Sequence, residues 1–123
     1  MRYSNLAVET DTYNATDLFP DLFSGGIVRF TKQGKTVVIT FWNMILKASL
    51  ANDTSKTYVY NTVVPEKYRQ SYSELVFYLI RGTDTHLTVL LQKGNNAFVI
   101  RNISGQNRVA GENYNGEVVY IQY

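Results

Sequence analysis

At the centre of the chain stands Val63-Val64-Pro65-Glu66-Lys67-Tyr68-Arg69-Gln70-Ser71. A β-branched run stops there at Pro65, which has no amide hydrogen to donate to a sheet, so the proline marks a strand end. The polar residues after it lead into a second apolar run. The stretch therefore indicates two strands joined by a connection, and it places Tyr68 and Arg69 in a turn that its own side chains must hold.

From Ile27 onward, almost every segment has strand character and is bounded by turn residues. Strands are expected at residues 27–32, 36–46, 57–64, 74–80, 85–92, 97–103 and 117–122. No stretch shows a helical period. Short strands with turns at this spacing predict an all-β fold, an antiparallel β-sandwich or jelly-roll-like domain of about seven or eight strands.

Composition limits the class of protein. The chain has 123 residues with 45% hydrophobic content, enough for one domain with a core. Its net charge of +2 comes from scattered residues, whereas nucleic-acid-binding proteins cluster basic residues on one face. There is no cysteine, and no apolar run has the length of a membrane span. We therefore expect no disulfide, no nucleic acid and no membrane insertion.

The sequence predicts a boundary near residue 24. Residues 1–24 are polar and interrupted by turn formers, which indicates a lead-in or linker segment. Residues 25–123 are expected to form a single β-sandwich domain. Within the lead-in, the amphipathic piece Leu18-Phe19-Pro20-Asp21-Leu22-Phe23 is expected to plug one end of the core.

The order of these motifs resembles the C-terminal domains of tail-fibre and baseplate proteins from phages of Gram-positive bacteria. The turn at Pro65 is similar to their Leu/Val-Pro-x-x-Tyr-Arg-Pro-Ser signature, although Lys67 and Gln70 stand where the family has glycine and proline. Residues 28–39 and 89–99 resemble the family's glycine-centred hairpins, and residues 115–121 its closing strand. The similarity runs from about Phe23 to the C-terminus.

This resemblance implies a function and a setting. It implies a homotrimeric receptor-binding domain that binds a host cell-wall saccharide or teichoic acid and contacts other phage tail or baseplate proteins. The expected location is the virion, in the phage tail or baseplate, and the bacterial cytoplasm before lysis. The alternative is a structural baseplate domain that docks onto other virion proteins without binding sugar.

Both faces of two predicted strands are apolar, although one face of a sandwich strand usually meets water. The side chains on the second face are Val38, Trp42, Met44, Leu46, Val76, Tyr78 and Ile80. Another copy of the protein is the natural cover for this face, which is a second reason to expect a homotrimer. Cover by the N-terminal segment is the other explanation. Trp42 is expected in the core or in a subunit interface.

No residues indicate catalysis or metal binding. The single histidine, His86, lies two residues after Asp84, and such a pair could act as a general base with its orienting carboxylate. However, the sequence places no serine or cysteine nucleophile beside it. Nothing fixes two carboxylates at the separation that a glycosidase requires. The loop 52–54 lacks the spaced acidic ligands of a calcium site. We expect no enzyme activity, no metal and no cofactor.

If consecutive strands alternate in direction, the connections 47–56, 81–84 and 104–116 share one end of the domain. Two of them are the longest loops, and long loops on a rigid β scaffold usually carry binding residues. Tyr114, flanked by asparagines, is expected there as an exposed stacking ring. The candidate ligand-binding residues are Asn52, Asp53, Arg81, Asp84, His86, Arg108, Asn113 and Tyr114. These side chains suit a polyhydroxylated ligand, and they suit a protein partner almost as well.

Overall fold

A computed structural model describes residues 7–61, 63–71, 74–83 and 85–122. Its strands are β1 (Val8–Asn14), β2 (Phe23–Gln33), β3 (Thr36–Leu46), β4 (Tyr58–Tyr60), β5 (Leu75–Arg81), β6 (Thr85–Leu91), β7 (Phe98–Arg101) and β8 (Asn113–Ile121). The helical elements are the short α1 (Ala15–Leu18) and the 3-10 turn η1 (Glu66–Tyr68). The predicted all-β class is confirmed.

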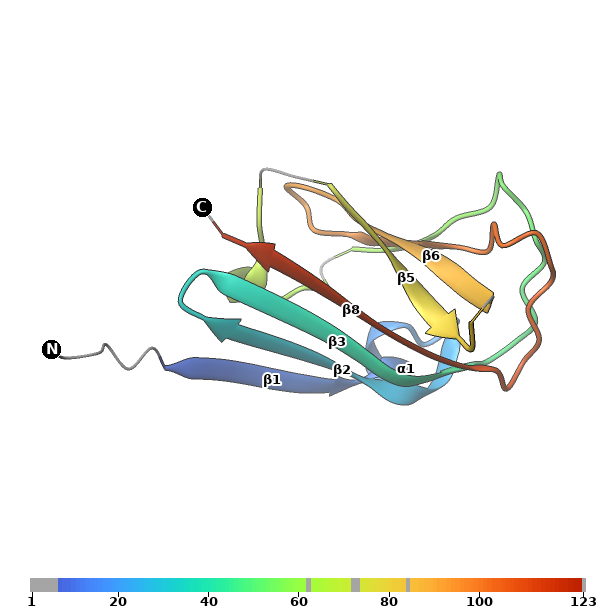
Figure 1. Ribbon diagram of the computed structural model, residues 1–123, viewed down its shortest axis with the longest axis horizontal. Helices are drawn as coiled ribbons and strands as arrows, with labels where there is room; N and C mark the ends of the chain where they lie inside the picture. Colours follow the sequence, from blue (N-terminus) through green and yellow to red (C-terminus); the bar gives the residue numbers. More distant parts are fainter. Residues whose placement is uncertain (1–6, 62, 72–73, 84, 123) are drawn as a thin grey trace, which may run out of the picture.

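The strands form one antiparallel sheet in the order β1-β2-β3-β8-β5-β6-β7-β4. The sheet curls over, so that β1, β2, β3 and β8 form one layer and β5 and β6 lie in the other (Figure 1). The two halves meet where Ile80 pairs with Asn115. Next to this pair, Gly116 lies so close to β5 that a Cβ atom there would be 2.6 Å from the carbonyl oxygen of Tyr78. The sheet can fold at this point because Gly116 has no side chain.

The core between the layers is built around aromatic rings. The centroid of Phe41 lies 5.5 Å from that of Phe77 and 5.6 Å from that of Phe98, so the rings join the β3 layer to the β5 and β7 layer. All three side chains are buried. Such rings bury large apolar areas, and the edge-to-face contact between Phe41 and Phe98 adds to the stabilisation.

The N-terminal segment belongs to the sandwich, so the predicted boundary at residue 25 is wrong for residues 8–24. β1 pairs with β2 along its whole length. The turn after α1 closes the open side of the sandwich, because Phe19 packs 4.7 Å from the ring of Tyr60 and Asp21 accepts a hydrogen bond from the Tyr60 hydroxyl at 2.8 Å. The expected plug is confirmed by the burial of Phe19 and Phe23. β1 looked like a linker because an edge strand with one wet face is mostly polar.

The proline connection is held by its own side chains, as predicted. Tyr68 is buried and stacks on Phe30 at 5.4 Å, and its hydroxyl donates a 2.6 Å hydrogen bond to Asp11. Arg69 donates through Nε to the carbonyl of Val64 at 2.9 Å. These contacts fix η1 against β1 and β2 at the end of the sandwich opposite the long loops.

A bulge in β3 changes the expected faces. The register with β8 shifts between Phe41 and Met44, and Asn43 takes a positive φ of 54°. Met44 and Leu46 therefore turn into the core, whereas Trp42 is 57% exposed. Trp42 is not in the core, because it alternates with the buried Phe41 and lies with Thr40 on the outward face of β3. Its other expected place, a subunit interface, stays a prediction.

The outer faces carry exposed apolar side chains from both layers. These side chains are Trp42, Val119 and Ile121 on one layer and Val76, Tyr78 and Ile80 on the other. The described part of the N-terminal segment lies at the sheet edge beside β2 rather than over these faces. Cover by the N-terminal segment, the alternative to a second copy, is therefore wrong for residues 8–14, and residues 1–6 lie outside the described residues.

Candidate functional site

The long loops lie together at one end of the sandwich, as predicted. An isolated bridge joins Leu50 to Arg108 through backbone hydrogen bonds of 2.9 and 2.8 Å, and so ties the connection after β3 to the connection before β8. In Figure 1 both connections lie at the right-hand end, near the turn between β5 and β6. We call this end of the molecule, formed by residues 47–57, 81–83 and 102–112, the loop end.

Asparagine side chains hold these loops in place. The Oδ1 atom of Asn107 accepts the amide of Asn52 at 2.9 Å, and the Oδ1 atom of Asn52 accepts the amide of Gly105 at 3.1 Å. Asn102 is buried and donates to the carbonyls of Leu50 and Gln106, each at 2.9 Å. Asn52, a predicted ligand-binding residue, therefore holds the loops together, and these loops are preorganised for a partner.

Glu112, absent from the predicted site, connects several loop-end groups. Its Oε2 lies 3.3 Å from Nη1 of Arg81 and 3.9 Å from Nη1 of Arg108. Its Oε1 accepts the amide of Val109 at 2.6 Å and the hydroxyl of Tyr114 at 3.2 Å. Glu112 follows Arg108 by four residues, but this spacing indicates an ion pair only on a helix, and residues 108–112 form a turn, so the sequence carried no signal for this network.

Tyr114 and Arg108 are buried, so their predicted roles as exposed ligand-binding side chains are wrong. Tyr114 is 0% exposed and Arg108 is 6% exposed. β8 begins at Asn113 rather than near residue 117, so Tyr114 is an inward strand residue between two outward asparagines. Burial, followed by the charge of Glu112, raises the pKa of Tyr114 to about 12. Both residues stabilise the loop end from inside.

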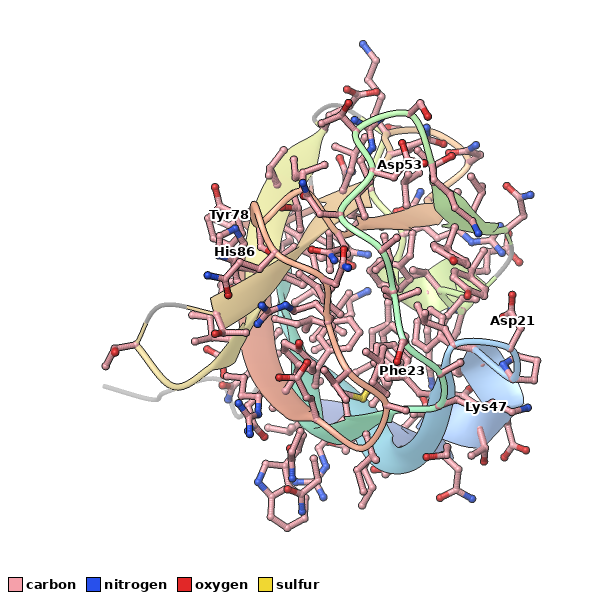
Figure 2. The ribbon with its side chains drawn as sticks, turned by 90° about the vertical axis from the view of Figure 1, so that its right-hand side faces the viewer. Asp21, Phe23, Lys47, Asp53, Tyr78 and His86 are labelled. Atoms are coloured by element: carbon pink, nitrogen blue, oxygen red, sulfur yellow. The ribbon has the colours of Figure 1, made fainter. Side chains whose placement is uncertain are left out.

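Of the remaining predicted residues, Arg81 pairs with Glu112, whereas Asp53 and Asn113 make hydrogen bonds to other residues. Asp53 accepts the amide and hydroxyl of Ser55 at 2.9 and 2.6 Å, and these hydrogen bonds lower the pKa of its carboxyl group. Asn113 is exposed and donates to Oδ1 of Asn43 at 2.8 Å. Asp84 lies outside the described residues. Figure 2 looks onto the loop end and shows Asp53 well separated from His86.

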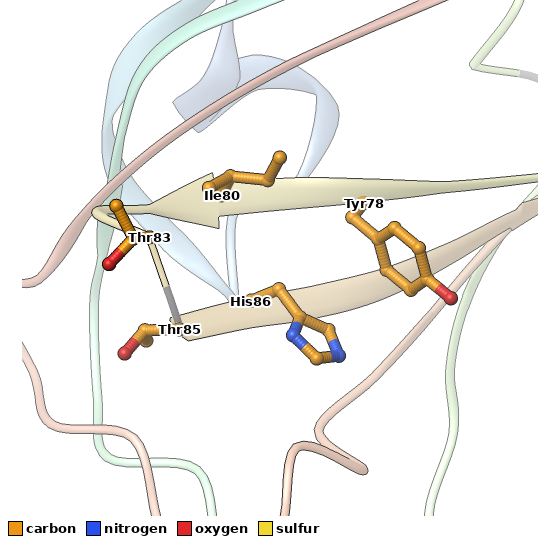
Figure 3. Close-up of a pocket in the computed structure, with 5 residues that line it drawn as sticks. All are labelled: Tyr78, Ile80, Thr83, Thr85 and His86. Atoms are coloured by element: carbon orange, nitrogen blue, oxygen red, sulfur yellow. The ribbon is translucent and has the colours of Figure 1, made fainter.

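An open pocket of about 340 Å³ lies beside the turn between β5 and β6. It is lined by Tyr78, Ile80, Thr83, Thr85 and His86 (Figure 3). The Tyr78 ring is half exposed and meets the His86 ring edge-on, with centroids 4.8 Å apart and planes at 69°. We call this the Tyr78 pocket. Of the predicted site residues, the Tyr78 pocket contains His86.

Strand pairing explains why these two rings meet. Ile80 pairs with His86 and Tyr78 pairs with Thr88, so the outward side chains of the two strands lie next to one another at the start of β6. The sequence placed Tyr78 on the face expected to meet another copy, because it alternates with apolar residues in one run, and gave no sign that its ring lines a pocket. The register of the β5–β6 hairpin was the missing information.

The Tyr78 pocket combines an aromatic ring, an imidazole and hydroxyl groups in an open setting. An aromatic ring stacks on the apolar face of a sugar at low entropic cost, and the polar groups can bind hydroxyls. Among the described residues, no group of three or more His, Cys, Asp or Glu side chains is placed to hold a metal ion. Within the same residues, no helix is long and apolar enough to cross a membrane.

Comparisons with protein-family models, with curated proteins and with solved structures each found no match for this chain.

Proposed function

We propose that this protein is a receptor-binding domain of a phage tail or baseplate and that it recognises a host cell-surface saccharide through the Tyr78 pocket. The observation that carries the proposal is the pocket itself, with a half-exposed tyrosine ring and a histidine edge beside preorganised loops. The resemblance of the proline turn and hairpins to phage tail domains supports the phage setting. The domain acts by binding, without catalysis.

A saccharide would stack on the ring of Tyr78 and take hydrogen bonds from His86 and Thr83. Each such hydrogen bond contributes about 0.5–1.5 kcal/mol net, so a single site should bind weakly. In a homotrimer on a particle with several copies, simultaneous engagement would raise the effective affinity by roughly 10²–10⁴. Weak single sites are therefore compatible with firm adhesion to a cell.

The test measures binding of the purified protein to intact Gram-positive cells, with purified wall polysaccharide and teichoic acid as competitors. We expect Tyr78→Ala to weaken the saccharide-competed binding by about tenfold, since the stacking surface is lost. Tyr78→Phe keeps the ring and should retain most of the binding. Equal loss in both variants, or binding that no saccharide competes, contradicts the assignment to this ring.

A structural baseplate domain is the second candidate function. The observation in its favour is the exposed apolar side chains on the outer faces, such as Val76 at 62% exposure, because such surfaces often mark protein interfaces. Tight association with another baseplate protein, together with no binding to cells, would favour this function over receptor binding.

A further inference from the structure

A row of polar side chains crosses the outer face of the first layer at right angles to its strands. Thr12 of β1 pairs with Arg29 of β2, Arg29 pairs with Thr40 of β3, and Thr40 pairs with Glu117 of β8. None of the four is buried. The Nε atom of Arg29 donates to Oγ1 of Thr12 at 3.3 Å, which orients the guanidinium group along the row. The row therefore places a cationic donor, an anionic acceptor and two hydroxyl groups on one surface.

Trp42 stands in the next row. It pairs with Ile27, and these two residues with Arg29 and Thr40 line a hollow of about 140 Å³. The indole ring is 57% exposed. A large exposed ring is thus placed between the apolar side chain of Ile27 and the polar row.

The fold fixes the position of Trp42 through the residue that follows it. The amide of Asn43 donates to Oδ1 of Asn115 at 2.9 Å, and Oδ1 of Asn43 accepts from Asn113 at 2.8 Å. On β2, Gly26 has a φ of 119°, and a Cβ atom there would lie 2.7 Å from the carbonyl oxygen of Asn43. Irregularities in two neighbouring strands therefore coincide next to Trp42, and side-chain hydrogen bonds hold the backbone there. The indole points outward because Trp42 alternates with the buried Phe41. Bulges of this kind are common next to functional sites.

We propose that Trp42, Arg29, Thr40 and Glu117 form a saccharide-binding platform that is separate from the Tyr78 pocket. The indole would stack on the C–H face of a pyranose ring, and the polar row would bind the hydroxyls at its edge. Arg29 donates, Glu117 accepts and Thr40 does both, which matches sugar hydroxyls. The platform takes a neutral saccharide, because the charges of Arg29 and Glu117 are opposite.

A neutral saccharide fits this surface better than a second copy of the chain. A protein interface over the row would take Arg29 and Glu117 out of water, and burying charges is costly unless each gains a well-placed partner. A saccharide can hydrogen-bond to both groups and leave them partly hydrated. The inference does not rest on the Tyr78 pocket, since no residue is shared between the two.

Trp42 is the single tryptophan of the chain, so its fluorescence reports directly on this surface. The test titrates the intact protein with cellotetraose, chitotetraose and purified Gram-positive wall polysaccharide. We expect a saturable blue shift or quenching with at least one of the three. Arg29→Met and Thr40→Val should weaken that binding by about three- to tenfold, which corresponds to the loss of single hydrogen bonds. Tyr78→Ala should leave the titration unchanged.

Trp42→Ala lacks the fluorophore, so its binding of the same saccharide is measured by calorimetry. The comparison is made in protein that carries Tyr78→Ala, so that the Tyr78 pocket does not contribute, and binding should weaken at least about tenfold. An emission that stays constant with all three saccharides overturns the proposal. So does an emission that shifts with protein concentration alone, which would identify the surface as an interface between copies. If cell binding depends on Tyr78 and not on Trp42, the receptor-binding function stands and the platform is rejected.

Discussion

Two tyrosine hydroxyls, at opposite ends of the sandwich, are affected by burial and by a nearby carboxylate. Burial and then the hydrogen bond to Asp11 raise the pKa of Tyr68 to about 12. The pKa of Tyr114 is also raised to about 12, by burial and then by the charge of Glu112. Hydrogen bonds from Tyr68 and then Lys67 lower the pKa of Asp11 in turn. In both places the neutral phenol is the form that the fold accommodates.

The raised pKa of Tyr114 predicts that the folded protein loses stability at alkaline pH. Tyr114 ionises near pH 10.0 when unfolded and at about 12 when folded, so it stabilises the protein fully below pH 10. That stability is lost as the pH rises from about 10 to about 12. We expect Tyr114→Phe to flatten the decline, and to cost about 1 kcal/mol at pH 8 through the lost hydrogen bond to Glu112. Urea unfolding at pH 8 to 11.5 measures both effects, and an unchanged pH slope would contradict the assignment.

Tyr114 also shows why single residues were misplaced from the sequence. Its neighbours Asn113 and Asn115 are typical of a loop, but in β8 they are the outward residues of a strand whose inward residues are Tyr114, Val118 and Tyr120. Alternation was visible only from residue 117 onward. The prediction that His86 lies at the surface of a hairpin agrees better with the structure, where its side chain is partly exposed at the start of β6.

At the scale of elements, strand β3 matches its prediction of 36–46 at both ends, because alternating apolar residues and the turn at Gly34 bound it clearly. Strand β1 was missed because Asp11 and Thr12 resemble linker residues. Neither the bulge at Asn43 nor the close approach at Gly116 can be recognised from the residues around it in the sequence. Both arise where strands distant in sequence meet, and therefore depend on the fold as a whole.

The crossing at Gly116 predicts a specific sensitivity. Gly116→Ala would place a methyl group 2.6 Å from the carbonyl oxygen of Tyr78, and that backbone atom cannot move away without separating β5 from β8. We expect a loss of about 1–3 kcal/mol in the free energy of unfolding. Gly25→Ala is the control, because its Cβ would meet the end of the Ile45 side chain at 3.2 Å. Thermal or urea unfolding compares them, and equal losses would show that the strand crossing is not the cause.

At the scale of the whole molecule, the two ends of the sandwich differ. The loop end carries the Tyr78 pocket, whereas the opposite end, near the proline turn, exposes Val119 at 53% and Ile121 at 45%. Val119 pairs with Val38 of β3, so these side chains lie side by side on the outer face. If copies meet through Val38, Val119 and Ile121 at this end of the face, with the row of Arg29, Thr40 and Glu117 left uncovered, the loop end stays free for a cell surface.

A homotrimer assembled in this way is expected to have three times the 14.1 kDa mass of the chain. Closed cyclic symmetry buries the same patch on every subunit and leaves none exposed for further growth. Val119→Glu would place a charge in that interface and should shift the mass toward the monomer. Val109→Glu, at the loop end and also exposed, should leave the mass unchanged. Light scattering after gel filtration at micromolar concentration measures both variants. A wild-type protein of monomer mass would reject the trimer, and equal effects of the two substitutions would reject the interface at Val119.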